Sequence, residues 1–187
     1  MGNKRNQVTG DSEMIRNELI PMYRELYYVY CMLNKACWNE ALPPCVITIS
    51  NRLRTCYAYA RSISETNCPL IAINYFECGR VNNDYLIGIL SHEMTHIWQF
   101  SKGRRGGHGR DFENEMLRVG LDIPNQLIIM DSPLVAFVKQ YRLKNFNLTA
   151  HLASMRKGDF SRREQIEFFL ANRQSFFNTR QEVINGR

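Results

Sequence analysis

The sequence predicts an α+β protein with one helix before a small mixed sheet, one helix after it, and a mostly helical C-terminal extension. Three observations support this prediction. Residues 21–38 repeat apolar side chains at steps of three and four, the period of a helix with one buried face. Residues 46–78 hold three strand-like runs rich in β-branched and aromatic residues. Residues 84–100 return to the helical period, and so does most of the chain beyond residue 122.

The chain is long enough for one domain with a buried core. It has 187 residues, of which 44% are apolar, and this suits a single folded unit that carries an extension. We expect residues 1–12 to be disordered and residues 13–121 to form the core. Residues 122–187 are expected to form a basic, mostly helical extension.

The first helix and the three strands have predictable ends. Pro21 fits the first helical position, where its missing N–H is not needed, and the run ALPPC at 41–45 ends the helix. The expected strands are VITIS (46–50), TCYAYARSI (55–63) and PLIAINYFEC (69–78). We expect the third, within PLIAINYF, to be the edge strand to which an extended peptide substrate adds.

The second helix is expected from about residue 84 to residue 100, with Asn82 or Asn83 as its N-cap. A glycine-rich loop, SKGRRGGHG, follows it, and DFENEMLRVG then predicts a short helix that Gly120 ends. The buried surface of the second helix is expected from Leu86, Ile89, Leu90, Ile97 and Trp98.

The cysteines and the hydropathy bear on the cellular location. All six cysteines precede residue 79, none forms a C-x-x-C pair, and the first residues lack the apolar stretch of a secretory signal. We therefore expect free thiols and a cytoplasmic protein, with association to a nucleoid or nucleus compatible with this location. No apolar run approaches the length that spans a bilayer, so no membrane partner is expected.

The net charge of +6 is concentrated at one end of the chain. Residues 1–138 hold 14 Lys and Arg against 14 Asp and Glu, whereas residues 139–187 hold 10 against 4. Such an asymmetry is typical of a segment that binds DNA or another polyanion. It is also typical of a solvated helical face, which is the simpler interpretation.

The run SHEMTHIWQF, residues 91–100, predicts a metal site. His92 and His96 lie four residues apart and therefore project from one face of a helix, where both imidazoles can bind one ion. Glu93 is rotated about 100° around the helix from His92. There it is badly placed as a ligand but well placed to take a proton from water at the metal. The spacing thus predicts two zinc ligands and one catalytic base.

A catalytic zinc site needs a third protein ligand. The motif with a further histidine six residues past His96 is absent, because position 102 is a lysine. We favour His108, which two glycines flank in the loop; glycine allows the tight turn that would bring this side chain to the ion. Glu113 and Glu115 on the next helix are the alternatives. His151 is expected to be a surface or packing residue.

Together these residues resemble the SprT-like metallopeptidases, the family related to the protease Spartan. His92-Glu93-Met94 with His96 and Trp98 is similar to the family's active helix, and Gly107-His108-Gly109 with Phe112 is similar to its third-ligand loop. Leu33-Asn34 and Leu42-Pro43 follow the family's order upstream. The resemblance covers about residues 20–121.

The resemblance implies a zincin-like fold and zinc peptidase chemistry. It implies His92, His96 and His108 as zinc ligands and Glu93 as base. One difference concerns DNA: several members carry a cysteine-rich zinc ribbon after the core, and this chain has no cysteine after Cys78. The basic extension is then the remaining candidate for contact with DNA.

Two classes of function follow. The first is an intracellular zinc endopeptidase that acts on a protein substrate, including proteins crosslinked to DNA; Tyr57, Tyr59 and Arg61 are candidates for stabilising the oxyanion. The second is a nucleic-acid- or partner-binding protein whose zinc site is structural or catalytically silent. A peptidase held inactive until a partner opens its cleft is a third alternative.

Overall fold

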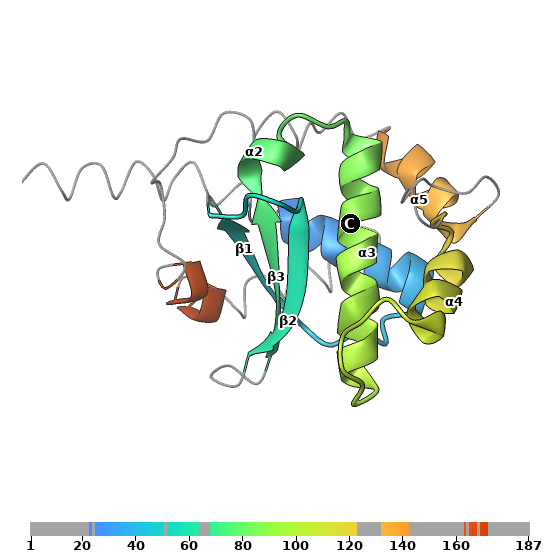
Figure 1. The fold of residues 1–187 in the computed structure, drawn as a ribbon. Helices are drawn as coiled ribbons and strands as arrows, with labels where there is room; N and C mark the ends of the chain where they lie inside the picture. Colours follow the sequence, from blue (N-terminus) through green and yellow to red (C-terminus); the bar gives the residue numbers. More distant parts are fainter. Residues whose placement is uncertain are drawn as a thin grey trace, which may run out of the picture.

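The computed structural model confirms the α+β class. A first helix (residues 25–38) precedes a three-stranded sheet, and the helices α2 to α5 follow it (Figure 1). The predicted disorder of residues 1–12 lies outside the described part of the chain. The structure describes residues 23, 25–50, 52–63, 68–122, 132–142, 163, 165–167 and 169–171.

The sheet contains β1 (Val46–Ser50), β2 (Ala58–Ile63) and β3 (Cys68–Asn74) in the order β1-β3-β2. β3 pairs parallel with β1 and antiparallel with β2, so the sheet is mixed, as predicted. The prediction that the third strand lies at the edge is wrong, because β3 is central. The side-chain pattern of this run does not show whether the strand is central or at the edge, because a strand covered on both faces is apolar on both faces in either position.

The third strand is also shorter than predicted. The side chain of Asn74 accepts hydrogen bonds from the backbone N–H groups of Phe76 and Glu77, and this caps the short helix α2 (Tyr75–Cys78). The amide of Asn74 donates to the carbonyls of Leu53 and Cys56 as well. One asparagine thus ends the strand and fixes the segment that leads into β2.

Side chains cover the outer edge of β1. The hydroxyl of Tyr27 on the first helix accepts from the N–H of Ile47 and donates to the carbonyl of Cys45. Further along, the amide of Gln165 bonds both the N–H and the carbonyl of Ile49. Phe169, 2% exposed, stacks on Tyr27 with the ring centroids 5.4 Å apart. Residues of the C-terminal extension therefore pack against the core.

The helix α3 (Asn83–Ser101) stands between β2 and the helices α4 (Arg110–Val119) and α5 (Pro133–Arg142), as Figure 1 shows. Asn82 is its N-cap, accepting from the N–H of Tyr85. Four of its five predicted core residues are buried; Trp98 is only half-buried and has the guanidinium of Arg104 over its ring.

The predicted short helix also forms, and Gly120 ends it. Its φ of 104° is one that glycine adopts far more readily than other residues, and a Cβ there would lie 2.2 Å from the side chain of Ser132. None of the six cysteines forms a disulfide, as predicted. None of the described helices is both long and apolar enough to cross a bilayer.

Candidate metal centre

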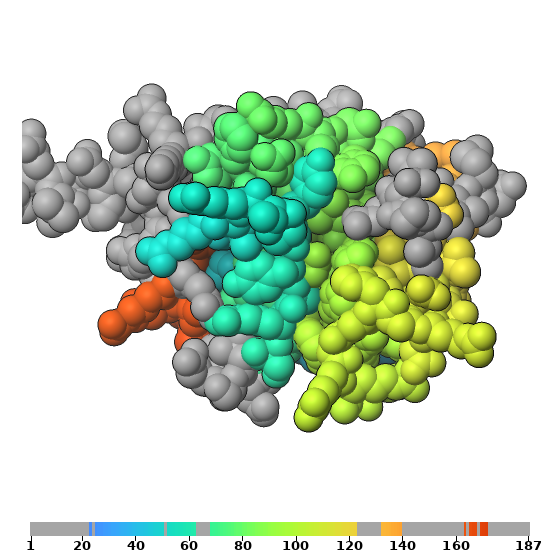
Figure 2. Space-filling view, in the orientation of Figure 1, coloured from blue at the N-terminus to red at the C-terminus, as the bar shows by residue number. Residues whose placement is uncertain are grey.

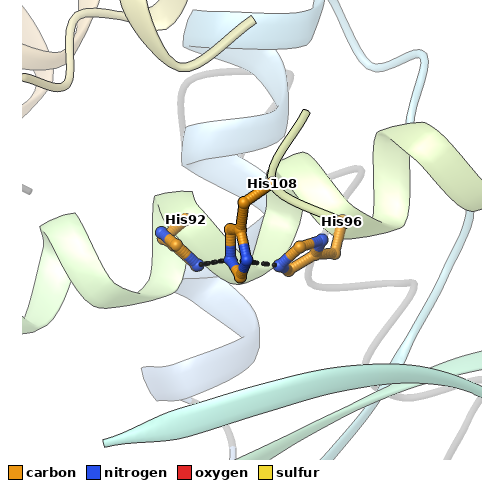
Figure 3. A group of neighbouring side chains, drawn as sticks. All are labelled: His92, His96 and His108. Carbon is orange, nitrogen blue, oxygen red and sulfur yellow. Dashed lines mark hydrogen bonds between the residues drawn. The ribbon is translucent and has the colours of Figure 1, made fainter. Parts of the chain in front are cut away.

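Three histidines from two elements meet beside the sheet. His92 and His96 project from the middle of α3, and His108 reaches between them from the loop that joins α3 to α4 (Figure 3). The Nε2 atom of His108 lies 3.1 Å from Nε2 of His92 and 3.3 Å from Nε2 of His96. The fold therefore brings together the three residues that the sequence predicts as ligands.

These distances fit a metal ion. An ion held tetrahedrally with zinc–nitrogen bonds of roughly 2.0–2.1 Å sets its ligand nitrogens roughly 3.3–3.4 Å apart. The three ligand atoms all lie within 4.8 Å of one another, and no other such group of His, Cys, Asp or Glu occurs among the described residues.

The protonation of these rings also suits a metal. Burial lowers the pKa of His92 to about 3, with contributions from His96 and His108. Burial lowers the pKa of His96 too, although its bond to Gln99 acts in the opposite direction. A neutral imidazole is the form that binds metal.

Glu93, the residue that follows His92 on α3, is a buried acid. Its side chain is on a residue only 5% exposed, and its Oε2 atom has no hydrogen-bond partner. Burial raises the pKa of Glu93 to about 8, while a hydrogen bond from the backbone of Ala60 on β2 acts in the opposite direction. A buried carboxyl oxygen without a protein partner is costly, and such oxygens occur at sites that bind a ligand or a water molecule.

A second group of contacts orients the ligands. Gln99, 4% exposed, lies on the last turn of α3, and its Oε1 atom is 2.9 Å from Nδ1 of His96. The same amide bonds the carbonyl and the N–H of Gly107, next to His108. In addition, Arg104 and Asp111 form an ion pair of 2.5 Å across the loop.

The ring of Phe112 contacts all three imidazoles. This ring is 3% exposed, and its centroid lies 4.9, 4.5 and 4.8 Å from those of His92, His96 and His108, respectively. An apolar wall of this kind excludes water and restricts the ring positions. Phe112 was expected only through the family resemblance.

The alternative ligands do not reach this group. Glu115 accepts instead from the indole N–H of Trp38 and from the guanidinium of Arg118, and Glu113 is exposed on α4. Both glutamates were candidates on the helix that follows the loop, so the sequence alone left this choice open. The structure groups His108, and neither glutamate, with His92 and His96.

The prediction that the glycines on either side of His108 are needed for a tight turn is wrong for these two positions. Gly107 and Gly109 have open space where a Cβ would lie, and neither has a positive φ. The loop favours glycine instead at Gly103, with φ 67°, and at Gly106, where a Cβ would lie 2.9 Å from the ring of Phe100 and 3.8 Å from Nδ1 of His96.

The candidates for an oxyanion donor lie on or next to β2. Tyr57 is 36% exposed and packs edge-on against Tyr85 of α3, with centroids 5.5 Å apart. Arg61 is half-buried on the strand, and its Nε atom has no hydrogen-bond partner. Their catalytic role stays a prediction.

Two histidines of one helix, a third from the following loop and a neighbouring small mixed sheet define a zincin-like α+β core with a site able to bind a metal ion. The model of the SprT-like family matches residues 26–130, which include the first helix, the sheet, α3, the loop and α4. The chain therefore belongs to the SprT-like family. Comparison with curated proteins and with solved structures gave no match.

Proposed function

We propose that this protein is an intracellular zinc-dependent endopeptidase of SprT type. The observation that carries the proposal is the convergence of three histidine rings, two of them on the helix that also carries Glu93, a buried acid with one oxygen that lacks a hydrogen-bond partner. His92, His96 and His108 would hold the ion. Zinc bound there would polarise the scissile carbonyl and acidify a water molecule. The absence of disulfides among the six cysteines fits a reducing compartment.

Glu93 is the proton carrier in this proposal. Its Oε2 atom has no other partner, so it is available to accept a proton from the attacking water and to pass it to the leaving nitrogen. The hydrogen bond from the backbone of Ala60 holds the carboxyl group in place without occupying that oxygen. Its position one residue after His92 matches the division of roles that the helix spacing predicts.

The substrate would bind as an added strand on β2. This strand has a strand neighbour on one side only and packs against α3 on the site's side, whereas side chains already cover the edge of β1. In Figure 2 a furrow separates β2 (teal) from the His108 loop and α4 (yellow-green). An extended peptide in this furrow would pair its backbone with β2 and pass the three histidines.

The test uses the full chain and casein as an unstructured protein substrate. We expect cleavage by the zinc-loaded wild type and about a 10²–10⁴-fold loss in Glu93→Gln, the range for removing a general acid–base group, with zinc content unchanged. Equal cleavage by both proteins would contradict the mechanism. Zinc binding without cleavage of any substrate, with or without DNA, would favour the alternative of a silent site in a binding protein.

A second proposal concerns DNA. The excess of basic over acidic residues in residues 139–187, 10 against 4, supports binding of this segment to a nucleic-acid backbone. Contact of this kind would direct the peptidase to DNA-associated proteins, including those crosslinked to DNA. Most of this segment lies outside the described residues, so the proposal rests on its charge alone.

A further inference from the structure

Gln99 connects the two parts of the chain that carry the candidate ligands. It lies three residues after His96 on α3, and its side chain reaches the loop residue that precedes His108. The amide makes three contacts: Oε1 to Nδ1 of His96 at 2.9 Å, Oε1 to the N–H of Gly107 at 3.3 Å, and Nε2 to the carbonyl of Gly107 at 2.9 Å.

The backbone of Gly107 determines which way this amide points. A backbone N–H can only donate and a carbonyl can only accept, so the amide oxygen must face the N–H and the amide nitrogen must face the carbonyl. The same oxygen faces Nδ1 of His96. Nδ1 must therefore carry the proton, and Nε2 of His96 keeps its lone pair directed at His108.

We propose that Gln99 is a positioning residue that performs two tasks with one amide. It fixes the tautomer of His96 that can bind a metal, and it holds the backbone next to His108 at the site. This inference rests on the proposed zinc site and adds to it the residue that joins the active helix to the third-ligand loop.

Only glutamine satisfies all three contacts. Glutamate at this position would still accept from His96 and from the N–H of Gly107, but it would place a carboxylate oxygen against the carbonyl of Gly107. Leucine has a similar size and makes none of the three bonds. The two substitutions therefore separate the tasks: Gln99→Glu keeps the acceptor that fixes the tautomer but loses the bond to the Gly107 carbonyl, and Gln99→Leu loses all three bonds.

The first measurement is the tautomer of His96 in the metal-free full chain, read from imidazole nitrogen chemical shifts at a pH where the rings are neutral. We expect the Nδ1–H form in the wild type and in Gln99→Glu, and a mixture of tautomers in Gln99→Leu. Ser101→Ala is the matched control, since Ser101 is exposed on the same turn and bonds only the carbonyl of Trp98. A pure Nδ1–H form in Gln99→Leu would overturn the first task.

The second measurement is zinc affinity in competition with a chelator. Loss of a side chain that orients a metal ligand typically weakens affinity about 10–100-fold. We expect a loss in this range for Gln99→Leu, a smaller loss for Gln99→Glu, and none for Ser101→Ala. Wild-type affinity in both Gln99 variants would overturn the proposal.

Neither readout depends on catalysis, so the two proposals can fail separately. If the wild type binds zinc but cleaves nothing, the peptidase proposal fails while the affinities still test Gln99. If the wild type binds no zinc, the zinc site fails, and the tautomer of His96 still tests whether Gln99 orients the ring.

Discussion

Glu115 has a structural role although its position on α4 allows a catalytic one. Its carboxylate, on a residue 6% exposed, accepts from the indole N–H of Trp38 at 2.8 Å and from two nitrogens of Arg118. Arg118 also donates to the carbonyl of Cys37 at the end of the first helix. This network ties α4 to the first helix and uses both oxygens of the carboxylate.

We therefore predict that Glu115→Ala lowers stability and leaves zinc affinity unchanged. The substitution leaves the buried N–H of Trp38 without an acceptor, which costs about 1–3 kcal/mol of the free energy of unfolding. Urea denaturation and a zinc titration measure the two effects. Glu113→Ala is the control, exposed on the same helix and expected to change neither. A marked loss of zinc affinity in either variant would restore a carboxylate as ligand.

Single residues differ in how far the sequence determines their role. The four-residue spacing of His92 and His96 fixes their common face, and the next position places Glu93 at its side. The position of His108 could be assigned only from the fold, because it lies twelve positions after His96, in the loop beyond the end of α3. Gln99 was missed, although residues three apart on a helix are neighbours and its pairing with His96 was detectable. Its contact with Gly107 was not detectable, because it depends on the conformation of the loop.

Among the elements, β1 depends on side chains for its outer hydrogen bonds. The N–H and carbonyl of Ile49 both bond the amide of Gln165, which Tyr23 also contacts through its hydroxyl. The Gln165 amide thus supplies the acceptor and the donor that a neighbouring strand would otherwise offer to Ile49. This arrangement closes one edge of the sheet and leaves β2 as the edge beside the histidines.

The prediction for this edge is that Gln165→Leu destabilises the whole core. The change removes the hydrogen-bond partners of the Ile49 N–H and carbonyl. Each buried backbone group that loses its partner costs about 1–3 kcal/mol of the free energy of unfolding. Thermal or urea unfolding measures the effect. Glu167→Ala, on the exposed side of the same segment, should leave the free energy of unfolding nearly unchanged. Equal stability of wild type and Gln165→Leu would show that the edge does not need this contact.

The elements themselves were largely predictable, but their arrangement was not. Periodicity located α3, α4 and the three strands to within a few residues, because the buried faces repeat with the period of each structure. Strand order follows from pairing between distant residues, which the alternation within one strand does not encode. The strand that the sequence favours as an edge, β3, is central in the sheet. Asn74 could have indicated the end of β3, since asparagine is a common N-cap.

In the whole molecule, the C-terminal extension has a packed part and a basic excess. Gln165 and Phe169 pack against the core and are each only 2% exposed. Removing residues 139–187 would therefore uncover the β1 edge, and a loss of DNA binding could then result from a loss of stability. The predicted division at residue 121 stays a prediction. A test of DNA binding should therefore change charges and keep the chain complete.

We predict that replacing Arg156, Lys157, Arg162 and Arg173 by glutamine weakens DNA binding and flattens its salt dependence. Each phosphate contact that is lost should reduce the slope of log affinity against log salt by about 0.9 on duplex DNA. Fluorescence anisotropy at several salt concentrations measures this slope. The same number of changes at Arg52, Arg54, Arg80 and Arg110, outside the extension, is the control. An unchanged slope in the first variant would contradict DNA binding by the extension.

The central claim is that histidines from α3 and from the following loop hold one zinc ion, and its most direct test is the zinc content and affinity of the purified full chain. We expect about one zinc per wild-type chain, the stoichiometry of a single catalytic site. His108→Ala should bind zinc much more weakly, and His151→Ala should bind like the wild type. Absence of zinc from the wild type, or wild-type affinity in His108→Ala, would contradict this account.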